Sequence, residues 1–238
     1  AYTYNKTVEG LIDAWRFAGI RRAPEALARL TDSVLPYLPE KALTREERRQ
    51  HPYTREAQLW DEPYVLPEAQ FQAWKLGLGE RHRRLGMRFL QDDALFDPLS
   101  KGISPFKGKH AYSHVNALNS AIEAHSVTGD AKYLRAAVNV FDFVQAQSYA
   151  TGGWGPNEEL LAPDDATTLA DSLQSTHRHF ETPCGAHAHF KLTRSLLAIT
   201  GDSRYGDSME RVLFNTILGA RPTTPAGDTF YYSDYAMQ

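Results

Sequence analysis

The stretch Val127-Thr128-Gly129-Asp130-Ala131-Lys132-Tyr133 is repeated, with conservative changes, as Ile199-Thr200-Gly201-Asp202-Ser203-Arg204-Tyr205. An amphipathic run lies on each side of both copies. Glycine is favoured just past a helix end because it adopts the left-handed conformation without a Cβ penalty. An aspartate directly after it can cap the next helix. We therefore interpret each Thr-Gly-Asp as the tight turn of a helical hairpin.

Two fainter turns occur earlier, at Gly19 and Gly79, and each also lies between two amphipathic runs. The helices expected from the four turns cover residues 8–18, 24–30, 71–78, 82–90, 115–126, 133–145, 185–198 and 205–218. Four successive hairpins predict an all-α fold, an (α/α) toroid forming one domain over residues 1–238. Because such barrels commonly close with six hairpins, we expect an incomplete (α/α)6 barrel. The one β signal is the alternation in Thr229–Ser233, which predicts a short strand.

The bulk composition excludes several classes of partner. The chain has 238 residues, 42% apolar and 23% charged, with a net charge of −3. This balance indicates neither a nucleic-acid nor a membrane partner, and no apolar run approaches the ~20 residues that span a bilayer. One cysteine permits no internal disulfide. The first residues show neither an initiator methionine nor a signal-peptide pattern, so the compartment is left open.

Long glycine- and proline-containing segments separate the hairpins, and one of them contains a candidate acid. In residues 152–159, Gly-Gly-Trp-Gly-Pro-Asn-Glu-Glu, Trp154 could stack on a sugar ring. Desolvation beside such a wall would raise the pKa of Glu158 or Glu159, as a general acid requires. The alternative is a surface loop that the tryptophan anchors to the core.

A second segment is rich in metal-ligand types. Within thirteen residues lie His177, His179, Glu181, Cys184, His187 and His189. Carboxylate, thiolate and imidazole suit Zn²⁺, and the i,i+3 spacing of Glu181 and Cys184 lets both face one way at a helix start. No standard zinc spacing fixes the set, so exposed histidines and a buried thiol are the alternative.

Polar side chains also open the helix expected at residues 115–126. The ring nitrogens of His110 and His114, the phenol of Tyr112 and the amide of Asn116 could bind sugar hydroxyls at a barrel mouth. The alternative is that Ser113 caps the helix and a histidine is buried in the core. Glu210 lies on the last helix, where a lone carboxylate is usually at the surface.

The order of several motifs resembles the bacterial β-L-arabinofuranosidase family, glycoside hydrolase family 127 and its relatives. The matching residues are Gly108-x-His110, Thr128-Gly129-Asp130, Thr151-Gly152-Gly153 with an acid soon after, Glu181-Thr182 near a cysteine, residues 191–194 Lys-Leu-Thr-Arg and residues 210–219 Glu-Arg-Val-Leu-Phe-Asn-Thr-Ile-Leu-Gly. The resemblance is weak before Glu62 and good from His110 onward.

The resemblance implies an (α/α)6 barrel followed by β-sandwich domains. Characterised members are retaining exo-hydrolases with a zinc-held cysteine nucleophile and a glutamate acid/base. By this resemblance Glu158 is the acid/base, with Glu159 as the near alternative, and Glu181 and Cys184 are zinc ligands. The implied sugar-binding positions are His110, Glu210 and either Tyr231 or Tyr232.

The sequence departs from the family pattern at two points. Pro183 lengthens the family's Glu-to-Cys spacing from two to three residues. The family's nucleophile belongs to a Cys-Cys pair beyond the tyrosines, so we expect the nucleophile outside these 238 residues and Cys184 to be a ligand. The expected function is a glycoside hydrolase acting on a terminal sugar. The rivals are an unsaturated-uronyl hydrolase or sugar epimerase on the same toroid, and a non-catalytic glycan-binding scaffold.

Overall fold

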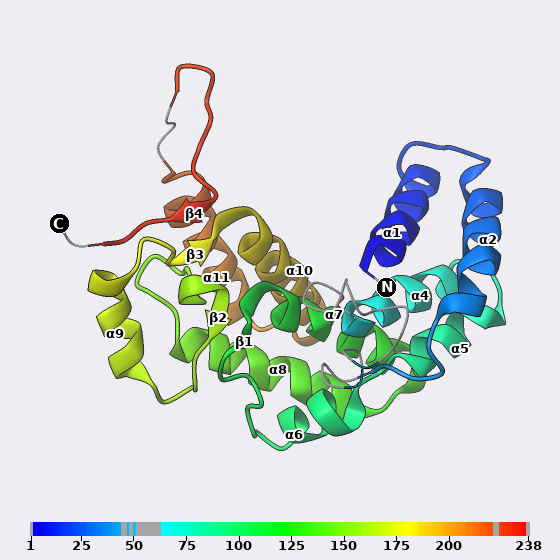
Figure 1. Ribbon diagram of the computed structural model, residues 1–238, viewed down its shortest axis with the longest axis horizontal. Helices are drawn as coiled ribbons and strands as arrows, with labels where there is room; N and C mark the ends of the chain where they lie inside the picture. Colours follow the sequence, from blue (N-terminus) through cyan, green and yellow to red (C-terminus); the bar gives the residue numbers. More distant parts are fainter. Residues whose placement is uncertain (1, 44–46, 48–49, 51–62, 221–223, 237–238) are drawn as a thin grey trace. The chain divides into compact units, whose positions relative to one another are not determined.

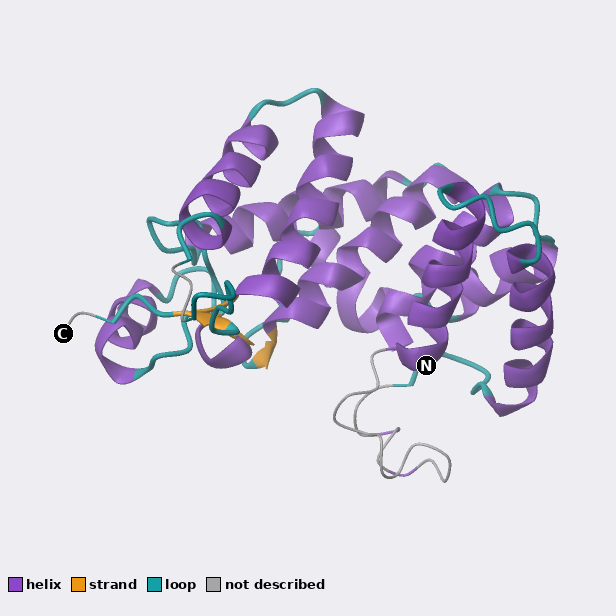
Figure 2. Cartoon of the chain, turned by 90° about the horizontal axis from the view of Figure 1, so that it is seen from above, coloured by secondary structure: helices purple, strands orange, loops and turns teal. Residues whose placement is uncertain are grey.

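The computed structural model describes residues 2–43, 47, 50, 63–220 and 224–236 (Figure 1). Within these residues helices dominate and the strands are only two residues long (Figure 2). The expected all-α class is confirmed. No helix in the described part is both long and apolar enough to cross a membrane.

All four predicted hairpins are present, and this prediction is confirmed. They are α1 (Tyr2–Arg16) with α2 (Ala23–Val34), α4 (Leu66–Lys75) with α5 (Glu80–Arg88), α7 (Ala111–Thr128) with α8 (Ala131–Ala146), and α10 (Thr182–Thr200) with α11 (Arg204–Val212). The turn glycines all have positive φ: 66° at Gly19, 109° at Gly79, 73° at Gly129 and 70° at Gly201. Glycine is favoured at these positions because a Cβ would strain the left-handed backbone.

The chain groups into two compact units, and the first comprises residues 1–94 and 120–131. Its core includes Val8, Ile12, Leu27, Leu66 and Phe89, each of which is at most 1% exposed to solvent. Gly86 of α5 lets this helix pack closely against Phe71 of α4. A Cβ at Gly86 would lie only 2.6 Å from the Phe71 ring. The short 3-10 helices η1 (Leu35–Tyr37) and η2 (Pro63–Val65) belong to this unit.

The second unit comprises residues 95–119 and 132–238. It contains α6 (Asp97–Ser100), most of α8, and the pair α10 and α11. The helix expected at 205–218 is an α-helix only as far as Val212 and continues as the π-helix η5 (Leu213–Ile217). Helix α9 (Ala166–Ser175) was not predicted, although the Asp165 side chain caps it by accepting a hydrogen bond from the Thr168 amide.

Two strand pairs position the site in this unit. Strand β1 (Lys109–His110) is antiparallel to β2 (Glu159–Leu160), which follows the 3-10 helix η4 (Pro156–Glu158). Strand β3 (Phe180–Glu181) is antiparallel to β4 (Tyr232–Ser233). The predicted C-terminal strand is thus confirmed within Thr229–Ser233.

Buried histidines predict that the fold loses stability in mild acid. Burial, reinforced by the charge of Arg81, lowers the pKa of His82 to about 4, and burial lowers that of His189 to about 4. An unfolded histidine titrates near ~6.5. Between these values the unfolded chain binds more protons, so stability is complete above the unfolded pKa and falls as the pH drops. Each histidine contributes about 3 kcal/mol to the full loss.

Urea unfolding at a series of pH values checks this expectation. His82→Leu should remove about half of the acid-induced loss, because His189 still contributes its share. An unchanged slope in His82→Leu would show that His82 is not the titrating group.

Candidate active site

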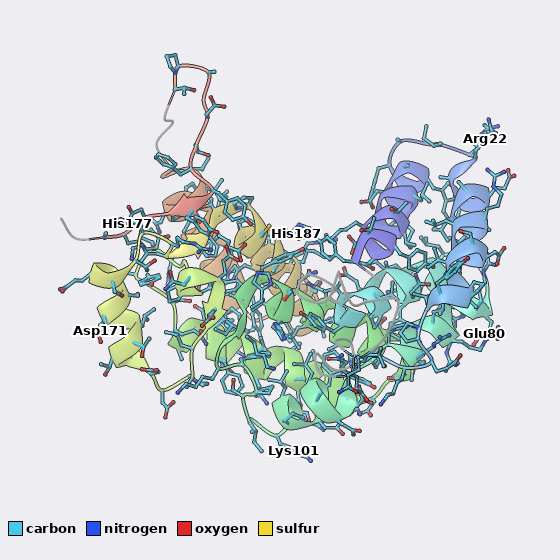
Figure 3. All side chains as sticks on the ribbon, viewed as in Figure 1. Arg22, Glu80, Lys101, Asp171, His177 and His187 are labelled. Carbon is cyan, nitrogen blue, oxygen red and sulfur yellow. The ribbon has the colours of Figure 1, made fainter. Side chains whose placement is uncertain are left out.

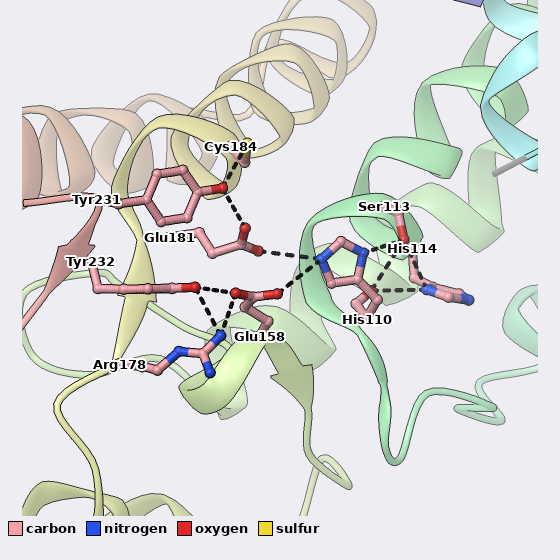
Figure 4. A network of polar contacts seen from close by, with 9 residues as sticks. All are labelled: His110, Ser113, His114, Glu158, Arg178, Glu181, Cys184, Tyr231 and Tyr232. Carbon is pink, nitrogen blue, oxygen red and sulfur yellow. Dashed lines mark hydrogen bonds and ion pairs between the residues drawn. The ribbon is translucent and has the colours of Figure 1, made fainter. Parts of the chain in front are cut away.

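The first strand pair brings an imidazole and a carboxylate together. His110 in β1 lies opposite Glu159 in β2, so Glu158, the residue before β2, comes beside the His110 ring. The Ser113 hydroxyl lies 3.0 Å from Nδ1 of His110. This contact turns Nε2 of the ring toward the carboxylates (Figure 4).

The backbone that carries Glu158 is unusual. Gly155, Asn157 and Glu158 have positive φ values of 76°, 55° and 65°. Non-glycine residues in the left-handed region are uncommon, and they cluster at functional sites. A Cβ at Gly155 would lie 2.5 Å from Cβ of Ala111. The glycine therefore lets this loop approach the start of α7.

The second strand pair brings two tyrosines to a buried glutamate. Glu181 ends β3 and faces Tyr232 across the β3–β4 register. The amide of Thr182 donates a hydrogen bond to the carbonyl of Tyr231 at 3.0 Å. Cys184 follows in the first turn of α10.

His110 lies between two glutamates. Its Nε2 is 3.7 Å from Oε2 of Glu158 and 3.6 Å from Oε2 of Glu181. One ligand atom from each of the three residues lies within 4.8 Å of the others, so among the described residues these three could hold a metal ion. The Glu158 side chain is 19% exposed and that of Glu181 is 6% exposed. The group is therefore sheltered but reachable from solvent.

The remaining oxygen of Glu158 is occupied by two donors. The Tyr232 hydroxyl and the Arg178 guanidinium both donate to Oε1 (Figure 4). Burial raises the pKa of Glu158, but these hydrogen bonds and the charges of Arg178 and His110 outweigh burial and hold the pKa below its ordinary value. The expectation that desolvation beside Trp154 raises this pKa is wrong. In the free site Glu158 is a carboxylate.

A tyrosine hydroxyl joins Glu181 to Cys184. Oη of Tyr231 lies 2.7 Å from Oε1 of Glu181 and 3.0 Å from Sγ of Cys184. Burial, and then the hydrogen bonds with Cys184 and Glu181, raise the pKa of Tyr231, so the phenol is protonated. Oε2 of Glu181 is buried without a hydrogen-bond partner.

With this geometry in view, comparison with known protein families gives a clear result. The sequence profile of the β-L-arabinofuranosidase GH127 catalytic domain matches residues 1–235. The chain belongs to the GH127 β-L-arabinofuranosidase family. A comparison with curated protein sequences found no match.

A solved structure of a GH127 member shares the fold of this chain. It is described as the GH127 β-arabinofuranosidase BT3674, and it superimposes with a TM-score of 0.68 at 18% sequence identity. The match covers 98% of this chain and 35% of the other. The likeness confirms the helical-hairpin fold, and the chain spans about a third of the length of that GH127 protein.

Six of the residues proposed for the GH127 site lie in one network. They are His110, Glu158, Glu181, Cys184, Tyr231 and Tyr232 (Figure 4). They come from four separate stretches of the sequence, which the two strand pairs bring together.

Trp154, Glu159 and Glu210 lie outside this network, whereas His114 joins it through His110 (Figure 4). Trp154 is 1% exposed and packs against Phe180, so the predicted stacking of Trp154 on a sugar is contradicted: the ring belongs to the core. Glu159 is exposed and is in the strand rather than in the cluster. The His114 ring contacts the His110 carbonyl oxygen at 2.8 Å and supports the backbone of that residue. Glu210 is exposed on α11, and no described hydrogen bond or ion pair joins it to the cluster.

The histidine-rich segment does not form one metal site. Buried His179 contacts the carbonyl oxygen of Ser172, and buried His189 contacts the Ser208 hydroxyl. His177 and His187 are both exposed (Figure 3). Of the six residues, Glu181 and Cys184 share the Tyr231 hydroxyl, whereas His177 and His179 pair with Asp234 instead.

One member of the network, Arg178, is not indicated by the sequence. Arg178 donates to Glu158 and also, at 2.8 Å, to the Tyr232 hydroxyl. Its position two residues before β3 brings it across from the acid loop, but no local pattern in the sequence indicates this pairing.

Proposed function

We propose that the site removes a terminal sugar, β-L-arabinofuranose, from a glycan with retention of configuration, and that Glu158 is its acid/base. The observation that carries the proposal is the Glu158 carboxylate in a sheltered cluster, with Oε2 directed at His110 and a second carboxylate beside it. Membership of the GH127 family supports the substrate class.

In this mechanism, Oε2 of Glu158 first takes up a proton. A thiolate attacks the anomeric carbon while Glu158 gives that proton to the departing glycosidic oxygen. The carboxylate then accepts a proton from water, and the resulting hydroxide equivalent displaces the thiolate and releases the sugar. We do not assign the attacking thiolate to Cys184, because the family pattern makes that position a ligand.

One observation favours a second way to achieve retention. Ligand oxygens of Glu158 and Glu181 lie within 4.8 Å, close to the ~5–5.5 Å that separates the two carboxyl groups of many retaining glycosidases. Glu181 would then attack the anomeric carbon in place of a thiolate. In this alternative Glu181 is essential for glycosylation even in metal-free protein.

We further propose that Glu181 and Cys184 are two ligands of a zinc ion. One hydroxyl, that of Tyr231, reaches Oε1 of Glu181 and Sγ of Cys184, so both donors converge on a single point. The inserted Pro183 lies in the first turn of α10 and does not separate them. A buried second carboxylate oxygen without a hydrogen bond further suits a cation. Bound Zn²⁺ would keep a coordinating cysteine in its thiolate form.

A zinc measurement tests this assignment. We expect the intact protein to bind about one Zn²⁺ by elemental analysis. Cys184→Ser should lose most of it, because a hydroxyl is a poor zinc ligand. Cys184 is half-buried, so the melting temperature of the apo protein should change little. Equal zinc in both proteins, or none in either, would contradict the assignment.

Hydrolysis assays separate the function from its rivals. The intact protein should release arabinose from p-nitrophenyl β-L-arabinofuranoside and from a β-L-arabinofuranosyl disaccharide. Turnover of an unsaturated uronide or epimerisation of a free sugar, without this hydrolysis, would favour another enzyme of the same fold. Tight glycan binding with no turnover would favour a scaffold.

A further inference from the structure

In the second unit, the loop that carries Glu158 is joined to residues 176–178 by backbone and side-chain hydrogen bonds. The amide of Asn157 donates to the carbonyl oxygen of Arg178 at 2.7 Å. The Thr176 hydroxyl donates to Oδ1 of Asn157 at 2.6 Å. These bonds hold the left-handed Asn157–Glu158 backbone against the segment that carries Arg178.

The Arg178 side chain completes this connection. Its Nη2 donates to Oε1 of Glu158 and, at 2.8 Å, to the Tyr232 hydroxyl, which itself donates to the same oxygen. The guanidinium carbon lies 4.7 Å from the centre of the Tyr232 ring. Stacking on the ring and the shared hydrogen bonds restrict the guanidinium to one orientation.

The two oxygens of Glu158 consequently have different surroundings. Both described donors converge on Oε1, whereas Oε2 faces Nε2 of His110 at 3.7 Å, beyond hydrogen-bond distance. A carboxylate that exchanges a proton with substrate needs one oxygen within reach of the reacting group and a fixed plane. Oε2 meets this need only while Oε1 is held.

We propose that Arg178 is a positioning residue that holds Oε1 of Glu158 and thereby reserves Oε2 for proton transfer. This proposal rests on the proposed function of Glu158 as the acid/base. Arg178 does not touch the sugar in this role, so it acts on turnover more than on substrate affinity.

Arg204 is a control for the alternative that Arg178 forms only a surface ion pair. Arg204 pairs with Asp142 at 2.7 Å, and its guanidinium carbon lies 4.7 Å from the Tyr205 ring centre. Its side chain is 40% exposed, against 47% for Arg178. Exposed pairs of this kind contribute little to stability. Arg204 also pairs with Asp202 at 3.1 Å and lies over the Phe141 ring, but none of these partners belongs to the proposed site.

The test compares Arg178→Ala, Arg178→Lys and Arg204→Ala in the intact protein. Arg178→Ala should lower kcat on the β-L-arabinofuranosyl disaccharide by about 10–100-fold with KM nearly unchanged, because a misplaced acid/base slows the reaction. Its melting temperature should stay within about 2 °C of wild type. Millimolar guanidinium should restore part of the activity of Arg178→Ala but none to Glu158→Gln. Arg178→Lys should retain more activity than alanine, and Arg204→Ala should turn over like wild type.

The outcomes separate this proposal from the one on which it rests. If Glu158→Gln is impaired and Arg178→Ala turns over like wild type, the positioning role is overturned and the acid/base role stands. A loss in Arg178→Ala that follows the melting temperature, without rescue by guanidinium, also overturns it. If Glu158→Gln retains full activity on the disaccharide, both proposals are wrong.

Discussion

Glu158→Gln should lower kcat/KM for a natural β-L-arabinofuranosyl linkage by about 10²–10⁴-fold. Glutamine keeps the shape of the side chain but can neither give a proton to the leaving oxygen nor accept one from water. The glycosylation step on p-nitrophenyl β-L-arabinofuranoside should suffer less, because that leaving group needs little protonation. Steady-state kinetics on both substrates measures this difference.

Glu159→Gln provides the matched control. Glu159 adjoins Glu158 but is exposed and lies outside the cluster. The control should turn over both substrates like wild type. A selective defect in Glu159→Gln instead would transfer the acid/base role by one residue. Equal losses on both substrates in Glu158→Gln, with a lowered melting temperature, would indicate that Glu158 only orders the loop.

Gly155→Ala should cause the second large effect, because it disturbs the loop that carries Glu158. The backbone φ of 76° costs an alanine about 1–2 kcal/mol. The new Cβ would also lie 2.5 Å from Cβ of Ala111, and such overpacking costs about 1–3 kcal/mol more. Chemical denaturation should show the summed loss, and turnover should fall because the loop is displaced from His110.

Gly201→Ala isolates the backbone part of this effect. Gly201 has a φ of 70°, but a Cβ there meets nothing within 4 Å. Its loss of stability should be limited to about 1–2 kcal/mol, and turnover should be unchanged. If the two variants are equally stable and equally active, close contact at Gly155 does not position the acid loop.

Local patterns in the sequence were sufficient to predict the hairpins. A turn glycine, a following cap and amphipathic runs are read within a few residues, and Gly129 and Gly201 occupy the expected left-handed conformation. Helix α9 was missed because its capping residue, Asp165, lies inside a segment interpreted as a loop. The one-domain expectation stays a prediction.

The site was harder to predict because it depends on pairings distant in sequence. Arg178 meets Glu158 through the packing of two loops, which no local spacing reveals. An aromatic loop of this kind predicts sugar binding, yet the Trp154 ring fills the core beside Phe180. The sequence also predicts that desolvation beside Trp154 raises the pKa of Glu158. Hydrogen bonds from Tyr232 and Arg178, which lie in two other segments, lower this pKa instead.

The configuration of the product formed with azide tests the role of Glu158 most directly. Glu158→Gln, given p-nitrophenyl β-L-arabinofuranoside and sodium azide, should regain turnover and form β-L-arabinofuranosyl azide, identified by NMR. Azide attacks the glycosyl-enzyme without a general base, so the configuration of the substrate is retained. The α-anomer would contradict the acid/base role, because it forms when azide replaces a missing nucleophile and attacks the substrate directly.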